Sequence, residues 1–130
     1  MHLVEQYRYP VAGRRWEFPS GSTERLDPDA SAAAVRELRE ETGLSATTLH
    51  PLGTLDTMPS TLDQKCSVFV ATGLTQESAN RDPEEQDMRS AWFTRSEVEH
   101  LITAGTICDG KSIAAYTLLL LSEAAARPDR

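Results

Sequence analysis

The pattern of apolar and polar residues predicts two extended segments at the start of the chain. Leu3 to Tyr9 has the composition of a strand, and Pro10 to Arg15, which contains Gly13, predicts a turn. Trp16 to Gly21 is a second, short extended segment that ends at a proline and a glycine. The polar residues from Ser22 to Asp29 then predict a loop.

A helix is predicted from Asp29 to Thr42, because this segment is rich in alanine, glutamate, arginine and leucine, which all favour helices. Asp27 or Asp29 can cap its N-terminus. Gly43 stands where a left-handed C-terminal cap is expected. The helix carries a narrow apolar stripe made of Ala34, Val35 and Leu38.

The second half of the chain alternates strands with helices, but not in regular βαβ units. The predicted strands are Leu49 to Thr57, Cys66 to Gly73 and Met88 to Phe93, with loops at 58–65 and 76–86. Thr94 and Glu97 have the spacing of a capping box and should open a helix that runs to about Ala104. A last helix is predicted from Ser112 to Ala125. We therefore expect one α+β domain over residues 1–130, layered as an α/β/α sandwich around a mixed sheet.

Composition narrows the classes of partner. The chain has 130 residues and a net charge of −7, so nucleic-acid backbones and anionic lipid surfaces are not expected partners. A small anionic substrate fits only where a metal ion or local arginines supply positive charge. Cys66 and Cys108 form no CxxC pair, and the three histidines have no zinc-ligand spacing. No signal peptide follows Met1, and the longest apolar stretch is too short to span a membrane, so we expect a cytoplasmic protein.

Three glutamates on the predicted helix give the sharpest chemical signal. At about 100° per residue, Glu41 lies about 40° to one side of Glu37 and Glu40 about 60° to the other. Like charges at this spacing, near the negative end of a helix, are unfavourable unless a cation offsets them. Mg²⁺ prefers carboxylate oxygens and shares its remaining positions with water and phosphates. The alternative is a solvated glutamate-rich face paired with Arg36 and Arg39.

Residues 36–44 read Arg-Glu-Leu-Arg-Glu-Glu-Thr-Gly-Leu, which resembles the second half of the Nudix box. Residues 17–21, Glu-Phe-Pro-Ser-Gly, resemble the strand and glycine that open that box. The front of the box is irregular, because the interval from Gly21 to Arg36 is one residue longer than in the family pattern. No glutamate occupies the first acidic position, where Asp27 or Asp29 can substitute.

The resemblance implies a metal-dependent hydrolase of a diphosphate bond. It assigns Mg²⁺, or Mn²⁺, to Glu37, Glu40 and Glu41, which would be both metal-binding and catalytic. The backbone carbonyl of Ser20 is implied as a further ligand. Arg36 would orient the glutamates by ion pairing.

Residues 4–11, Val-Glu-Gln-Tyr-Arg-Tyr-Pro-Val, resemble a strand of the ADP-ribose pyrophosphatase branch of the family. That branch implies a nucleoside diphosphate derivative as substrate, with ADP-ribose or a nucleotide sugar leading. Arg8 is the implied phosphate contact, and an exposed strand arginine is the alternative. Trp16 is a candidate to stack on a base, and packing in the core is its alternative. The implied general base is Glu84 or Glu85, with Asp63 in the other loop, and a solvated loop carboxylate is the alternative for each.

Members of that branch carry further residues before this strand, so we expect the usual N-terminal strand to be lacking. An uncovered sheet edge favours pairing with another chain, which predicts a homodimer. A second hypothesis is a non-catalytic Nudix-like module that binds and senses a nucleotide sugar. The irregular box front favours the sensor, whereas the intact glutamates favour the enzyme.

Overall fold

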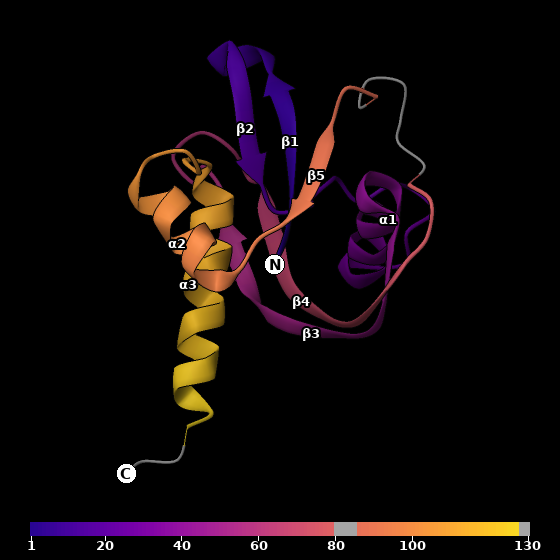
Figure 1. Cartoon of the computed structure of the whole chain (residues 1–130). Coiled ribbons are helices and arrows are strands. Elements are labelled where there is room, and N and C mark those ends of the chain that lie inside the picture. Colours follow the sequence, from indigo (N-terminus) through magenta and orange to yellow (C-terminus); the bar gives the residue numbers. More distant parts are fainter. Residues whose placement is uncertain (80–85, 128–130) are drawn as a thin grey trace.

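The first hairpin and a strand from late in the chain form one sheet. The computed structural model describes residues 1–79 and 86–127. In it, β1 (His2–Arg8) pairs antiparallel with β2 (Gly13–Glu17) on one side and with β5 (Arg89–Trp92) on the other, giving the order β2-β1-β5 (Figure 1). The turn predicted at Pro10–Arg15 is shorter in the structure, since β2 already begins at Gly13. The chain reverses through a 3-10 turn at Tyr9–Val11, followed by Ala12 in the left-handed region. β1 is therefore an interior strand of its sheet.

The middle of the chain forms a separate long hairpin. β3 (Leu44–Asp56) pairs antiparallel with β4 (Lys65–Gln76), and the register shifts between Pro51 and Gly53. Both strands are longer than predicted, because pairing continues through threonine-rich ends that carry little apolar alternation. Threonine suits a half-exposed strand through its branched Cβ, so the backbone ladder does not need an apolar pattern there.

Helices lie on both sides of the strands. α1 (Ala30–Thr42) stands on one side, and α2 (Arg95–Thr103) and α3 (Gly110–Ala125) on the other (Figure 1). The α+β class and the α/β/α layering are confirmed. Every strand pairing among the described residues is antiparallel, so the expectation of a mixed sheet was wrong. No helix of the described chain has the length and apolarity needed to cross a membrane.

The apolar core lies between the first sheet and the pair α2 and α3. Its buried members are Leu3, Val98, Ile107 and Tyr116. The Tyr116 hydroxyl donates to Glu99, and burial, followed by this contact, raises the pKa of Tyr116 to about 12. The predicted capping box is present, because Thr94 and Glu97 cap each other's backbone amides at the start of α2. Leu3 therefore packs the face of β1 that carries it against α2 and α3.

The predicted apolar stripe of α1 is only partly buried, because Ala34 and Leu38 are half-buried and Val35 is exposed. Val35, assigned to the apolar stripe, is 47% exposed, whereas the buried residues are Ala33, Glu41 and Thr42. The apolar pattern was misleading at Val35, because α1 turns the Glu41 carboxylate, and not Val35, toward the body of the domain. At the helix ends the prediction holds, with Asp29 as N-cap and Gly43 as C-cap.

Replacing Gly43 with alanine is expected to lower the free energy of unfolding by about 2 kcal/mol. Gly43 has a φ of 72°, and a Cβ on it would lie 2.3 Å from the carbonyl oxygen of Glu77. Gly105 is a matched control, since it also has a positive φ but no atom within 4 Å of the added carbon. Urea unfolding should show a larger loss for Gly43→Ala than for Gly105→Ala. Equal losses would mean that backbone strain alone, without the clash, sets the effect.

Candidate active site

The C-terminal half of α1 meets the segment that follows β2. Glu41 is fully buried, and its Oε2 accepts a hydrogen bond from the Ser20 amide at 3.1 Å. A Cβ added to Gly21 would fall 1.9 Å from Oε1 of Glu37, so the Glu37 carboxylate fills the space beside this glycine. The two glutamates are four residues apart on one helix face. Glu41 therefore lies against Ser20, and Glu37 lies against Gly21.

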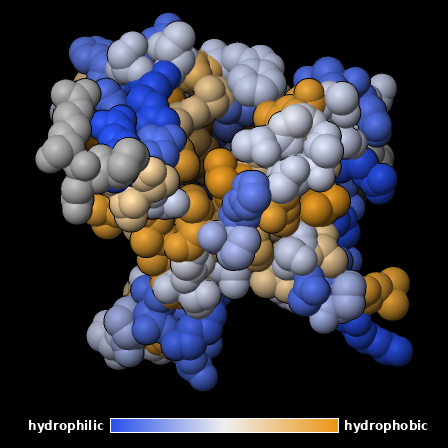
Figure 2. Space-filling model, turned by 90° about the horizontal axis from the view of Figure 1, so that it is seen from below, coloured by the Kyte–Doolittle hydropathy of each residue, from blue (hydrophilic) through white to orange (hydrophobic). Residues whose placement is uncertain are grey.

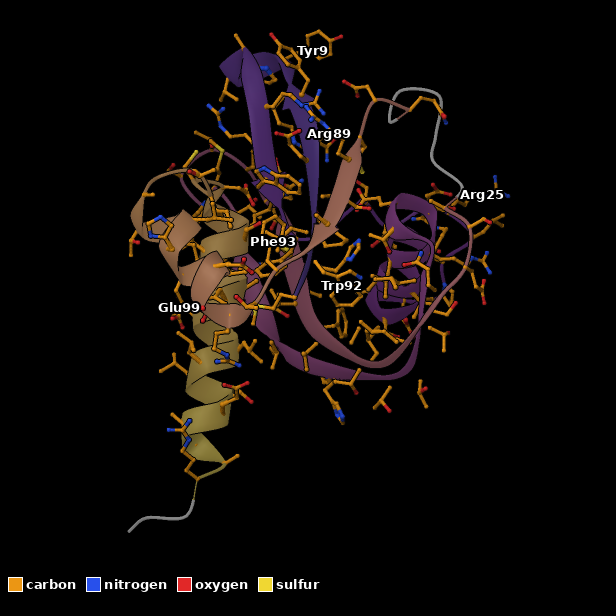
Figure 3. All side chains as sticks on the ribbon, in the orientation of Figure 1. Tyr9, Arg25, Arg89, Trp92, Phe93 and Glu99 are labelled. Carbon is orange, nitrogen blue, oxygen red and sulfur yellow. The ribbon has the colours of Figure 1, made fainter. Side chains whose placement is uncertain are left out.

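Arg36 ties the loop before α1 to the glutamates. Its Nη1 donates to Glu37 at 2.9 Å and to Glu40 at 2.8 Å. Its Nη2 donates to Asp27 at 3.0 Å and to the Ser22 carbonyl at 2.9 Å. The predicted orienting role of Arg36 therefore has a geometric basis, and it extends to the loop. Figure 3 labels Arg25 in this loop, beside α1.

The two aspartates of the irregular box front have different roles. Asp29 accepts from the Ala32 amide and caps α1. Asp27 takes the ion pair with Arg36, which holds the pKa of the Asp27 carboxyl below its usual range. Asp27 is therefore the acidic residue that meets the box arginine, and the extra residue in the loop is accommodated without loss of this contact.

The donor set is suited to a hard divalent cation. Glu37, Glu40, Glu41 and the Ser20 carbonyl are all oxygen donors, which Mg²⁺ and Mn²⁺ prefer. The missing side chain at Gly21 leaves Glu37 free to approach the backbone there. Among residues 1–79 and 86–127, however, no three acidic, histidine or cysteine side chains are already grouped as metal ligands. Instead, Arg36 pairs with Glu37 and Glu40, and Glu41 accepts from the Ser20 amide.

Arg8 is held by a buried partner that the sequence did not reveal. Its guanidinium makes two bonds to Glu17, at 2.9 and 2.6 Å, and Glu17 is 3% exposed. This contact raises the pKa of Arg8, and the charges of Asp109 and Glu41 add to the effect. The signal was in the hairpin register, since strand alternation places Arg8 and Glu17 on one face of the paired strands.

Of the remaining candidates, Trp16 and Asp63 belong to the described residues, and each lies in other surroundings than the glutamates of α1. Trp16 packs edge-on against Phe93, with ring centroids 5.1 Å apart, in the core on the opposite face from its neighbour Glu17. Figure 3 labels Phe93 where the chain passes from β5 toward α2. Trp16 is partly buried, and these contacts are those of its core-packing alternative. Asp63 lies in the exposed loop between β3 and β4, in a shallow hollow lined by that loop and the strand ends beside it. Glu84 and Glu85 lie outside the described residues.

Replacing Gly21 with alanine is expected to raise the Mg²⁺ concentration needed for half-maximal activity by about tenfold. The new Cβ cannot coexist with the present position of Glu37, so either the carboxylate or the loop must move. Isothermal titration with Mg²⁺ or Mn²⁺ would measure the change directly. Gly110→Ala is the control, because a Cβ there meets nothing within 4 Å. An unchanged metal affinity in Gly21→Ala would show that the approach of Glu37 to Gly21 is not needed for metal binding.

Comparisons with known proteins agree with this geometry. The NUDIX domain model matches residues 1–116. The chain is 36% identical over 113 residues to an ADP-ribose pyrophosphatase of Mycobacterium tuberculosis, and 33% identical over 123 residues to a methanol dehydrogenase activator of Bacillus methanolicus. The alignments cover 86% and 94% of this chain, but only 55% and 66% of those relatives.

Solved structures give the same fold. A structure described as an ADP compounds hydrolase superposes with a TM-score of 0.84 at 22% identity, covering 98% of this chain and 68% of its own. A MutT structure gives a TM-score of 0.58 at 20% identity, with coverages of 77% and 72%. At these identities the likeness concerns the fold alone. The family model matches most of the chain, and Glu37 and Glu41 lie against Gly21 and Ser20, respectively. The chain therefore belongs to the Nudix family.

Proposed function

We propose that the protein hydrolyses the diphosphate bond of a nucleoside diphosphate derivative in a divalent-cation-dependent reaction. The observation that carries the proposal is the contact of Glu37 and Glu41 with Ser20 and Gly21. It brings two carboxylates to the backbone of Ser20 and Gly21, whose Ser20 carbonyl we propose as a further ligand. Mg²⁺, when bound, neutralises diphosphate charge and activates water for attack.

We assign different roles to the residues around Ser20 and Gly21. Glu37, Glu40, Glu41 and the Ser20 carbonyl would hold the cation, and Arg36 would orient Glu37 and Glu40. Arg8 would bind a substrate phosphate with the face of its guanidinium group that Glu17 leaves open, since its side chain is 38% exposed. Glu17 fixes the direction of this guanidinium through two bonds. We propose Glu84 or Glu85 as the general base, with Asp63 as the alternative.

ADP-ribose is the substrate we propose first, with nucleotide sugars second. Support comes from the names of relatives: two of them, from M. tuberculosis and Bacillus subtilis, are ADP-ribose pyrophosphatases, at 36% and 29% identity. The solved ADP compounds hydrolase has the same fold. The expected products are a nucleoside monophosphate and a sugar phosphate.

A substrate panel at fixed Mg²⁺ tests the proposal. ADP-ribose, ADP-sugars and GDP-sugars would be incubated with the protein, and released phosphomonoesters detected after treatment with a phosphatase that spares intact diphosphates. We expect turnover of ADP-ribose that stops when EDTA is added and returns with Mg²⁺ or Mn²⁺. Turnover that persists in EDTA would contradict the cation-dependent mechanism.

The competing function is a sensor that binds a nucleotide sugar without cleaving it. Arg36 favours it in one respect, because its pairs with Glu37 and Glu40 neutralise two of the carboxylates without a metal. Tight binding of ADP-ribose by calorimetry, with no phosphomonoester released at any Mg²⁺ or Mn²⁺ concentration, would establish the sensor.

A homodimer in the cytoplasm is part of the proposal. β2 and β5 are the edge strands of the first sheet, and Trp92 at the end of β5 is 57% exposed. Figure 2 shows apolar surface across the middle of the view from below. Leu120 and Leu121 of α3 add exposed apolar side chains. Light scattering after size exclusion would give the mass, and a monomer at micromolar concentration would contradict the dimer.

A further inference from the structure

We propose that Ser112 is a positioning residue for the proposed metal site, which consists of Glu37, Glu40, Glu41 and the Ser20 carbonyl. It acts on Ser20 through the backbone of Phe18, from the side of the domain opposite α1. The inference rests on the proposed function, because it concerns how the Ser20 carbonyl is aimed. Ser112 lies on the first turn of α3, whereas the glutamates lie on α1. Its hydroxyl reaches the backbone of the segment that joins β2 to the glycine loop.

The Ser112 hydroxyl is held in a single orientation. Its Oγ donates to Oδ2 of Asp109 at 2.8 Å and accepts from the Phe18 amide at 3.0 Å. An ionised carboxylate can only accept, so the hydroxyl proton points to Asp109 and a lone pair faces Phe18. The same Oδ2 accepts from the Ser112 amide at 2.9 Å and caps α3. Ser112 is 3% exposed, so water does not compete freely for these bonds.

The segment from Phe18 to Ser20 is therefore anchored at each of its amides. Phe18 is bound to Ser112 of α3, and Ser20 is bound to Glu41 of α1. Pro19 between them has no amide hydrogen and a fixed φ. Two opposed anchors and a proline leave little freedom to the Ser20 carbonyl, which is a proposed ligand. Loss of the Ser112 anchor releases one side of this clamp.

The test uses Ser112→Ala, Ser112→Thr and a control, Ser122→Ala, which changes an exposed serine on the same helix. Mn²⁺ binding to each protein is measured by electron paramagnetic resonance without substrate, and steady-state kinetics are followed over a range of Mn²⁺ concentrations. We expect Ser112→Ala to weaken Mn²⁺ binding about tenfold, a change typical of lost outer contacts to a metal site. Its KM for substrate at saturating Mn²⁺ should stay unchanged, and Ser112→Thr, which keeps the hydroxyl, should recover most of the affinity.

Two further results are decisive. If the wild type binds Mn²⁺ and Ser112→Ala binds it equally well, the positioning role is overturned while the proposed function stands. If the wild type binds no Mn²⁺, the proposed function and this inference both fail. Ser112→Ala itself separates the clamp from helix capping, because its backbone amide still donates to Oδ2 of Asp109. Should Ser112→Ala fail to fold, Ser112→Cys, with its weaker acceptor, takes its place, and unchanged Mn²⁺ affinity would again overturn the role.

Discussion

Glu41→Gln is expected to lower kcat/KM for the substrate by about 100- to 1000-fold, the range seen when one electrostatic contact to a transition state is removed. Glutamine has nearly the same shape as glutamate and its side-chain oxygen can still accept from the Ser20 amide, so the site should keep its geometry. What is lost is the charge of a carboxylate that the fold buries completely. A charge buried this deeply is costly unless a partner offsets it.

Stability measurements separate this effect from misfolding. Without a divalent cation, Glu41→Gln should unfold at a urea concentration close to that of the wild type, because glutamine keeps the shape of the side chain and the acceptor for the Ser20 amide. Millimolar Mg²⁺ should stabilise the wild type and not the variant, since a ligand stabilises only the state that binds it. Glu123→Gln, on the far half of α3, is the charge-matched control and should keep both activity and the Mg²⁺ effect. A variant with wild-type turnover would remove Glu41 from the mechanism.

Sequence alone predicted much of the fold, and the errors have physical causes. The capping signals at Asp29, Gly43 and Thr94 are local, because each acts on amides within a few residues, and all three were confirmed. Strand lengths were underestimated at Leu44–Asp56, since its ends are set by pairing with β4 and not by an apolar pattern. Val35 was misassigned because burial on α1 depends on which face meets the strands, which is a tertiary property.

In the candidate site, too, local features could be predicted from the sequence and tertiary contacts could not. Glu37, Glu40, Glu41 and Arg36 could be read from spacing on one helix, and the structure brings Arg36 to Glu37 and Glu40 as expected. The contact between Arg8 and Glu17 joins two strands of one hairpin, and the contact between Ser112 and Phe18 joins α3 to a segment 94 residues earlier in the chain. The first contact depends on strand register and the second on the packing of α3, so no local sequence pattern predicts either of them.

Arg36→Gln is expected to lower the free energy of unfolding by about 2–3 kcal/mol without divalent cations, between the small loss for an exposed ion pair and the larger loss for a buried one. Its guanidinium lies among Glu24, Asp27, Glu37 and Glu40, and the side chain is 19% exposed. Removing it leaves four carboxylates near one another with no cation between them.

Added Mg²⁺ should reduce this difference from the wild type, because a bound cation replaces part of the lost positive charge. Urea unfolding at several Mg²⁺ concentrations measures it, with Arg39→Gln, an exposed arginine of the same helix, as the control. Arg36→Lys should be intermediate, since an ammonium keeps the charge but cannot bond the loop and the glutamates together. If the deficit of Arg36→Gln does not change with Mg²⁺, Arg36 serves only to fix the loop, and Glu37 and Glu40 do not share a cation site.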